Sequence, residues 1–269
     1  MTKADLFQPT RRSFATGAAA LVAASALPRA ALAQPALDVP YVPTPQDVVD
    51  RMLSLVKPTA QDFVMDLGCG DGRMLVTAAS KFGARGFGVD LNPVRIQEAT
   101  ANAKAANVSD KIRFEVRNLF QTSIKDANVL TMYLLPSVNL QLRPRILDEM
   151  RPGSRIVSHA FHMGDWEPDV QTEAIGRTIY HWIVPAKIAG KWAISDGGKT
   201  YDVMLEQKFQ KLTGMAVVDG MNLRLQGFMR GGDFSITVNT PDGLKVFNGA
   251  IADVNITPAA GSSWTMRKA

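Results

Sequence analysis

Residues 64–73 read Val-Met-Asp-Leu-Gly-Cys-Gly-Asp-Gly-Arg, and a second short motif, Gly-Phe-Gly-Val-Asp-Leu-Asn, follows at residues 86–92. In each motif an apolar stretch of strand character runs into a carboxylate, and the first continues into a glycine-rich turn. A helix predicted over residues 73–82 connects them. Because this order is typical of nucleotide pockets at the carboxyl edge of a parallel sheet, the two motifs predict such a pocket.

The residue types of the loop narrow the class of ligand. Its three glycines let the backbone turn sharply and approach a ligand that a Cβ would block. Asp90 is placed to accept hydrogen bonds from two ribose hydroxyls. The glycine spacing departs from the Gly-x-Gly-x-x-Gly of dinucleotide turns, and the carboxylates of Asp66 and Asp71 would repel a pyrophosphate. The motif favours a ligand with a cationic end over a turn in which glycines serve packing alone.

The N-terminal 33 residues have the pattern of an export signal. Thr-Arg-Arg-Ser-Phe at residues 10–14 precedes an alanine-rich apolar run, and Ala-Leu-Ala at residues 31–33 resembles a signal-peptidase site. This is similar to a twin-arginine signal and predicts export by the twin-arginine translocase to the periplasm or beyond. The alternatives are a basic tail or a misplaced start, with the protein cytoplasmic. The apolar run is too short for a stable membrane span.

Composition limits the remaining chain to one α/β core and a small extra module. Cleavage would leave residues 34–269 with 26 basic and 24 acidic residues, and no basic run that would indicate nucleic-acid binding. Cys69 is the single cysteine, so no intramolecular disulfide can form. We interpret Cys69 as a small residue filling a tight turn, because no histidine lies near it in sequence.

Periodicity predicts alternating strands and helices up to residue 186. Helices are expected over residues 46–56, 73–82, 93–106 and 140–150, and strands over 63–67, 85–89, 112–116, 127–134, 155–159 and 178–184. Thr44 is the expected N-cap of the first helix, with Pro45 at its first position. The alternation predicts an α/β fold with a doubly wound, Rossmann-like parallel sheet over residues 34–186.

The pattern changes to short alternating segments in residues 187–269. Strands are expected over 201–209, 223–228, 234–238 and 244–251, with hairpin turns at 197–198, 219–220, 231–232 and 242–243. These features predict a small antiparallel β module at the C-terminus.

The segment from Val42 to about Pro168 resembles class I S-adenosylmethionine-dependent methyltransferases. Within them it is similar to the protein-lysine methyltransferases of the ATP synthase c-subunit type. The matching words are Pro-Tyr-Val-Pro-Thr-Pro at 40–45, Asp-Leu-Gly-Cys-Gly-Asp-Gly-Arg at 66–73, Asp-Leu-Asn-Pro at 90–93 and Gly-Asp-Trp-x-Pro at 164–168. The resemblance implies that S-adenosyl-L-methionine is the cofactor.

The resemblance also implies which residues bind that cofactor. The methionine end would lie against the glycine loop, the ribose against Asp90 and the adenine against Leu91 and the residue after the third strand. Family members usually carry aspartate at that last position, where this chain has Asn118, an uncharged acceptor. The full implied set is Asp66, Gly68, Cys69, Gly70, Asp71, Gly72, Asp90, Leu91, Asn92, Asn118 and Leu119.

The acceptor side is marked less clearly. Tyr133 stands where family members bring in the methyl acceptor, and it could steer an amine by its hydroxyl or by a cation–π contact. Residues 133–136, Tyr-Leu-Leu-Pro, lack the acid or amide that precedes the proline in nucleobase-amine methyltransferases. His159, after the fifth strand, is a candidate base or a loop-capping residue. No cluster of ligands predicts a metal site.

We therefore expect a methyltransferase that acts on an amine, with a protein lysine as one candidate acceptor. The second hypothesis is an exported, non-catalytic ligand-binding protein on a retired methyltransferase fold, because S-adenosylmethionine is made in the cytoplasm. A small-molecule methyltransferase is the third. An open acceptor face would favour a protein acceptor, and a closed apolar pocket would favour a small molecule.

Overall fold

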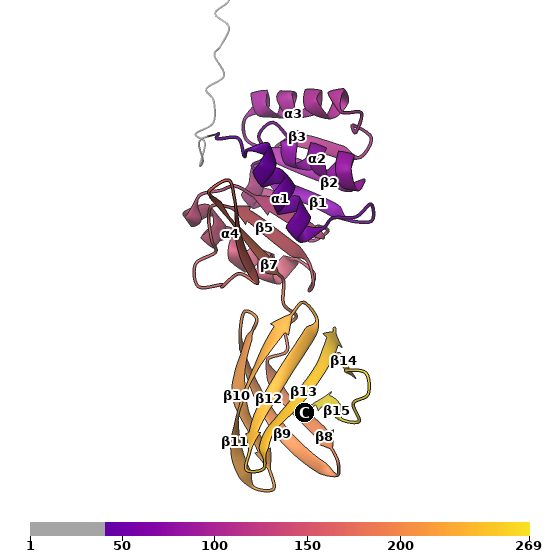
Figure 1. The fold of residues 1–269 in the computed structure, drawn as a ribbon, viewed down its shortest axis with the longest axis vertical. Helices are drawn as coiled ribbons and strands as arrows, with labels where there is room; N and C mark the ends of the chain where they lie inside the picture. Colours follow the sequence, from indigo (N-terminus) through magenta and orange to yellow (C-terminus); the bar gives the residue numbers. More distant parts are fainter. Residues whose placement is uncertain (1–40) are drawn as a thin grey trace, which may run out of the picture. The chain divides into compact units, whose positions relative to one another are not determined.

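The computed structural model describes residues 41–269, so the predicted export signal lies outside the described residues. These residues form a seven-stranded and an eight-stranded sheet (Figure 1). The seven-stranded sheet has the order β3-β2-β1-β4-β5-β7-β6. Its strands are β1 (Phe63–Leu67), β2 (Arg85–Asp90), β3 (Ile112–Val116), β4 (Val129–Met132), β5 (Arg155–His159), β6 (Val170–Ala174) and β7 (Arg177–Ile183).

Four α-helices and one short 3₁₀ helix accompany this sheet within residues 41–183. They are α1 (Gln46–Val56), α2 (Arg73–Phe82), α3 (Pro93–Ala105), α4 (Pro136–Glu149) and η1 (Leu119–Gln121). Successive strand residues serve different cores: Val64 packs in the cluster that holds α1, α2 and α3, and Met65 in the cluster that holds α4. Because side chains alternate across a strand, the helices cover both faces of the sheet.

The predicted fold class is confirmed, with corrections at particular elements. The predicted parallel strand over residues 178–184 is antiparallel: it is β7, which pairs with β5 and with the unpredicted β6 in a hairpin. The strand predicted over residues 127–134 is only Val129–Met132, and the helix predicted over 140–150 begins at Pro136. Pro136 occupies the first helical turn, where its missing N–H costs nothing, so the chain leaves the sheet earlier than expected.

The cap assigned to α1 is also corrected. Pro45, not Thr44, is the N-cap residue, and its carbonyl accepts from the amides of Val48 and Val49. No side chain caps this helix. The Thr44 hydroxyl is therefore available for the contact with His159 described below.

The eight-stranded sheet is an antiparallel meander of order β14-β13-β12-β11-β10-β9-β8-β15. Its strands are β8 (Gly190–Asp196), β9 (Lys199–Lys208), β10 (Lys211–Val218), β11 (Met221–Arg230), β12 (Asp233–Thr240), β13 (Gly243–Ala252), β14 (Asn255–Pro258) and β15 (Thr265–Lys268). The two edge strands, β14 and β15, contact each other, so the sheet curls back on itself. Buried aromatic residues, including Phe247 and Trp264, fill the interior.

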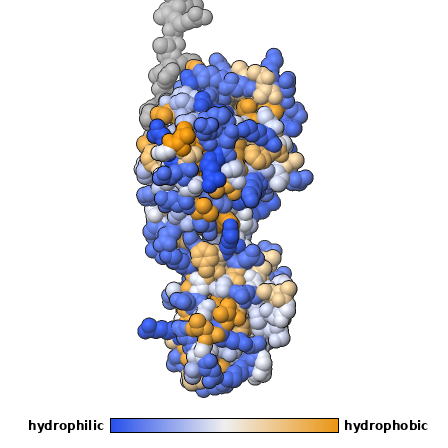
Figure 2. Space-filling model, in the orientation of Figure 1, coloured by the Kyte–Doolittle hydropathy of each residue, from blue (hydrophilic) through white to orange (hydrophobic). Residues whose placement is uncertain are grey.

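The predicted turns at residues 197–198, 219–220 and 231–232 are present, and the turn predicted at 242–243 lies one residue earlier, at 241–242. Four strands were missed: β8, β10, β14 and β15. The turn between β9 and β10 carries no glycine; Phe209 takes the left-handed conformation there, with φ 55°. Met204, Met215 and Phe228 are each partly exposed on this sheet. Figure 2 shows apolar residues interspersed with hydrophilic ones on the visible surface. In residues 41–269 we find no helix with the length and hydropathy that crossing a bilayer requires.

Candidate functional site

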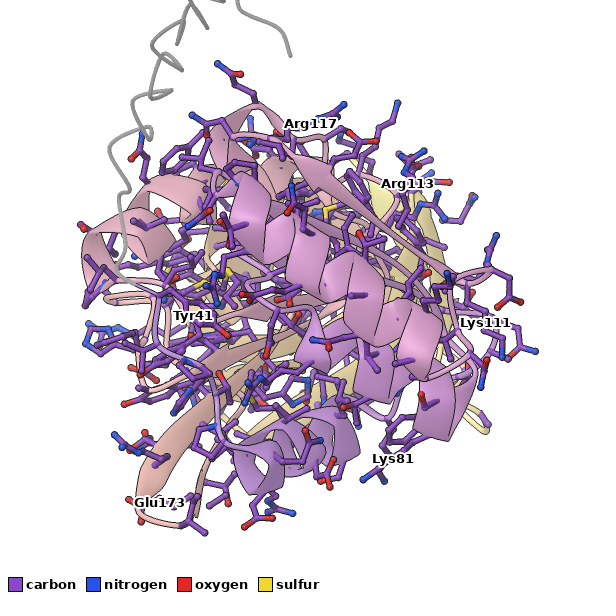
Figure 3. All side chains as sticks on the ribbon, turned by 90° about the horizontal axis from the view of Figure 1, so that it is seen from above. Tyr41, Lys81, Lys111, Arg113, Arg117 and Glu173 are labelled. Atoms are coloured by element: carbon purple, nitrogen blue, oxygen red, sulfur yellow. The ribbon has the colours of Figure 1, made fainter. Side chains whose placement is uncertain are left out.

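A pocket lies where β1, β2 and β4 end, at the carboxyl edge of the parallel strands. It is lined by Tyr41, Val42, Pro43, Thr44, Asp66, Gly68, Cys69, Gly70, Asp71, Arg73, Met74, Val89, Asp90, Leu91, Asn92, Arg95, Arg117, Leu119, Met132, Tyr133 and Leu134. This is the position that the order of strand, loop and helix predicts for a ligand. Tyr41 and Arg117, on the lining, are labelled in Figure 3.

The glycine loop joins β1 to α2 in a conformation that side chains disfavour. Gly68, Gly70 and Gly72 have φ values of 77°, 52° and 76°. A Cβ on Gly70 would lie 2.5 Å from the Tyr41 ring. The amides of Gly68 and Cys69 both donate to the Val89 carbonyl, which ties the loop to β2. Glycine is therefore required both for the turn and for the close approach of a neighbouring segment.

Asp90, the last residue of β2, organises the loop. Its Oδ2 accepts from the Gly70 amide at 3.0 Å, and its Oδ1 accepts from the Asn92 amide at 2.9 Å. Each oxygen therefore accepts one hydrogen bond from the backbone and has a second acceptor position for another donor. Because Asp90 lines the pocket, those remaining positions are available to ligand hydroxyls.

Asp66, in β1, places a carboxylate at the pocket floor. It is 6 % exposed, and its Oδ1 accepts from the Thr131 hydroxyl of β4 at 2.8 Å. Burial raises the pKa of Asp66 to about 7, the Thr131 hydrogen bond opposes this rise, and the charges of Asp90 and Asp71 add to it. A cationic group bound beside Asp66 would favour its ionised form.

Asp71 does not present an unpaired charge to the pocket. Both of its oxygens accept from the Arg73 guanidinium, with Nε–Oδ1 at 2.9 Å. Burial opposes ionisation of Asp71, but the Arg73 hydrogen bonds outweigh it and lower the pKa of Asp71. Asp71 should therefore contribute less than the sequence predicted to the like-charge repulsion of a pyrophosphate.

The residues just before α1, 41–45, form one wall of the pocket, and we call them the pre-helix segment. Arg73 Nη1 donates to the Thr44 carbonyl at 2.8 Å, which fastens the segment to α2. The Arg95 guanidinium of α3 lies 4.3 Å from the centroid of the Tyr41 ring. The sequence indicated this wall only through the Pro-Tyr-Val-Pro-Thr-Pro word, and no binding role was predicted for Tyr41, Arg73 or Arg95.

The structure brings most of the predicted cofactor residues to the pocket. Leu91, Asn92 and Leu119 line it together with the loop. Gly72 is not on the lining; it is the N-cap of α2, where a Cβ would meet the Phe114 ring at 2.7 Å. Asn118 is not on the lining either. Its Oδ1 accepts from the Phe120 amide and caps η1.

Cys69 lines the pocket but is buried. Burial, reinforced by the charges of Asp66 and Asp90, raises the pKa of the Cys69 thiol well above its usual value. The thiol therefore stays protonated at neutral pH, which favours the interpretation of Cys69 as a small packing residue over a nucleophile.

Aromatic rings gather on the side of the pocket formed by β4. Tyr133, directly after β4, lines the pocket. Its ring centroid lies 3.9 Å from that of His159 and 5.9 Å from that of Phe161. His159 is 1 % exposed and does not line the pocket. Burial, with a smaller effect of the Arg177 charge, lowers the pKa of His159 to about 4.

The residues present fit S-adenosylmethionine. The loop keeps Cβ atoms out of the pocket, Asp66 offers a buried carboxylate for a cationic end, and Asp90 retains acceptor positions for hydroxyls. Asn118, implied as an adenine contact, is off the lining, whereas its neighbours Arg117 and Leu119 are on it together with Leu91. Fold and pocket together define a class I methyltransferase.

Comparison with known proteins supports the assignment to the methyltransferases. The ANTKMT methyltransferase domain family matches residues 66–170. A protein-lysine N-methyltransferase of Saccharolobus islandicus is 42% identical over 151 residues, which are 54% of this chain and 94% of that enzyme. The mouse adenine nucleotide translocase lysine N-methyltransferase is 35% identical over 49% of this chain, which spans 57% of that protein.

A solved structure supports the fold and the cofactor. The RNA methyltransferase from Salinibacter ruber in complex with S-adenosyl-L-homocysteine is 46% identical, with a TM-score of 0.54, over 55% of this chain and 96% of that one. The chain belongs to the family of S-adenosylmethionine-dependent methyltransferases that includes the Saccharolobus protein-lysine N-methyltransferase. The predicted enzyme class and cofactor are thus confirmed.

Proposed function

We propose that this enzyme methylates the ε-amino group of lysine in a protein. The observation that carries the proposal is the Tyr133 ring on the lining of the cofactor pocket, which packs against the rings of His159 and Phe161 behind it. Aromatic faces attract a lysine side chain through its methylenes and its ammonium. Two of the similar proteins are named lysine N-methyltransferases, which supports lysine as the acceptor here.

The groups around Tyr133 are suited to alignment rather than to strong acid–base chemistry. Bound S-adenosylmethionine supplies a methyl group on a sulfonium, and a neutral amine can accept it directly. With a pKa of about 4, His159 is too weak a base to remove a proton from a lysine ammonium. We infer that the chain holds the amine in place and keeps water away, while solvent takes up the proton before transfer.

The test uses the full-length enzyme with tritium-labelled S-adenosylmethionine and a proteome extract. We expect label in protein bands, and methyl-lysine after digestion and mass spectrometry. The Asp90→Ala variant is the control for a cofactor-dependent signal. Label that resists protease and is released by ribonuclease would instead identify RNA as the acceptor, which is the acceptor that the name of the Salinibacter enzyme gives for that protein.

Titration with S-adenosylhomocysteine separates this proposal from the retired-fold hypothesis. Micromolar binding is expected of a working cofactor pocket. A protein that binds no cofactor would make the non-catalytic hypothesis the better one. A protein that binds it and labels only small molecules in the extract would favour the small-molecule methyltransferase.

We further propose that the enzyme is exported by the twin-arginine route. The support is the Thr-Arg-Arg-Ser-Phe word at residues 10–14 with its apolar run and Ala-Leu-Ala site. Because that route carries folded proteins, export would be compatible with a chain that has one cysteine and no disulfide. Cell fractionation should find mature protein beginning at Gln34 outside the cytoplasm. Replacing Arg11 and Arg12 by lysine should abolish this, and an unchanged distribution would contradict the proposal.

A further inference from the structure

His159 contacts the pre-helix segment and Tyr133, which both line the pocket, although His159 itself does not line it. Its Nδ1 lies 3.2 Å from the Thr44 hydroxyl of the pre-helix segment, within hydrogen-bond distance. Its ring packs against Tyr133 with 3.9 Å between centroids and 31° between planes. Thr44 and Tyr133 both line the pocket, and they come from distant parts of the sequence. A single buried side chain at the end of β5 therefore joins them.

The contacts that hold Thr44 and Tyr133 come from different elements. Thr44 is held on one side through its carbonyl, which accepts from Arg73, and on the other through its hydroxyl, which meets His159. Tyr133 follows the last residue of β4, so the sheet ladder no longer fixes it. Its ring is placed by the rings of His159 and Phe161.

We infer that His159 is a positioning residue that holds the pre-helix segment through its hydrogen bond to Thr44 and the Tyr133 ring through packing, so that cofactor affinity and acceptor handling each depend on one contact of the same buried side chain. Assigning Tyr133 to the acceptor side rests on the function proposed above. The role of His159 extends that function, because a residue off the pocket lining would then affect both cofactor affinity and acceptor handling.

The remaining properties of His159 agree with a purely geometric role. Its Nε2 is buried and has no hydrogen-bond partner among the described residues. Its pKa of about 4 keeps the ring neutral at physiological pH. The hydrogen bond to Thr44 and the packing on Tyr133 are thus its specific contacts with the two walls, and they can be removed separately.

Two substitutions separate the contacts. His159→Phe keeps an aromatic ring against Tyr133 but removes the hydrogen bond to Thr44. His159→Asn places an amide near the position of Nδ1, so the bond to Thr44 can persist while the ring packing is lost. Thr44→Val removes the same hydrogen bond from the other side and covers the case in which a His159 variant fails to fold. Melting temperature reports folding for every variant.

The first readout is calorimetric titration of the full-length variants with S-adenosylhomocysteine. We expect His159→Phe and Thr44→Val each to raise the Kd about three- to tenfold, because a net hydrogen bond contributes that much. The double variant should be no worse than either single one, since both remove the same bond. His159→Asn should bind within about twofold of the unaltered enzyme.

The second readout is steady-state transfer to poly-L-lysine. His159→Asn should lower kcat/KM for the acceptor about tenfold, and His159→Phe should leave the KM for the acceptor within about twofold. A merely structural role would lower the melting temperature and affect both readouts in all variants alike.

Unchanged Kd values in His159→Phe and Thr44→Val would overturn the inference, and so would additive losses in the double variant. Failure of the proposed function looks different: the unaltered enzyme would methylate no lysine at all. The titrations with S-adenosylhomocysteine would then still decide whether the hydrogen bond between His159 and Thr44 supports the cofactor pocket.

Discussion

The Thr131 hydroxyl on β4 donates to the Asp66 carboxylate on β1, across neighbouring parallel strands at the floor of the pocket. The Asp66 carboxylate that accepts this hydrogen bond is buried, and the charges of Asp90 and Asp71 lie near it. The bond favours the ionised form of Asp66, and burial disfavours it more, so the pKa of Asp66 is raised to about 7. The pocket thus holds a carboxylate whose charge changes near neutral pH.

Cofactor affinity should depend on pH through Asp66. Because a cationic end binds better beside an ionised carboxylate, the association constant for S-adenosylmethionine should rise by up to about tenfold between pH 6 and 8 and level off above pH 8. Asp66→Asn should bind weakly, with little pH dependence over the same range. Calorimetry at pH 6, 7 and 8 measures both. Parallel pH profiles in the two proteins would show that another group is responsible.

Gly70→Ala should damage the pocket far more than the fold. The substitution forces φ 52° on an alanine and drives its Cβ to 2.5 Å from the Tyr41 ring, so the pre-helix segment must move. We expect at least a tenfold loss of S-adenosylhomocysteine affinity, with a stability loss of about 1–2 kcal/mol. Gly176→Ala is the matched control, because Gly176 has φ 70° and no atom near its Cβ position. That variant should lose comparable stability and no affinity, and equal affinity losses in both variants would contradict the expectation.

Asp90→Ala and Asp90→Asn should differ in a graded way. Alanine removes the acceptors for the Gly70 and Asn92 amides along with those for a ligand, so binding should fall by two orders of magnitude or more. Asparagine keeps one acceptor oxygen and should retain measurable binding. Titration with S-adenosylhomocysteine ranks the variants, and circular dichroism confirms that both fold. Wild-type affinity in Asp90→Ala would remove Asp90 from the site.

Local sequence patterns were sufficient where the signal was itself local. The helices at residues 46–56 and 73–82 and the strands at 63–67, 112–116 and 155–159 were predicted with their observed bounds. In these segments apolar periodicity, glycine and proline all favour the same structure. The β9–β10 hairpin illustrates the opposite case. In its turn Phe209 adopts a left-handed conformation, and the turn has no glycine or asparagine from which the sequence would predict it.

The contacts that complete the site depend on tertiary structure. The Thr44–His159 hydrogen bond joins residues far apart in sequence, and Thr44 alone favours a helix cap. The pairing of Asp71 with Arg73 depends on the glycine turn before α2, because residues two apart do not face each other on a helix. The pre-helix segment lies against the loop only because Gly70 leaves room for Tyr41, a relation that neither residue reveals alone.

Stability of the ligand-free protein should be greatest near pH 6.5, since buried groups with opposite shifts limit it on either side. Burial lowers the pKa of His159 and of His181 to about 4, with smaller effects of neighbouring arginines. Between pH 6.5 and 4 the unfolded chain therefore binds more protons at these histidines, and stability falls as the solution is acidified. Asp66 has the opposite sign: its raised pKa means that the folded chain binds the extra proton, so its contribution is lost as pH rises through 7.

Melting temperatures from pH 4.5 to 8 test this balance. His181 lies in β7, away from the pocket lining, and its Nε2 has no partner among the described residues, so His181→Phe removes one titrating group without touching the cofactor wall. That variant should lose less melting temperature than the unaltered protein when the pH falls from 6.5 to 4.5. Asp66→Asn should instead flatten the decline above pH 6.5 and make the fall on the acid side steeper, because the folded Asp66 binds an extra proton up to about pH 7 and so opposes the effect of the histidines. If His181→Phe kept the full acid decline, the decline would have to come from His159, the other histidine whose pKa is lowered to about 4.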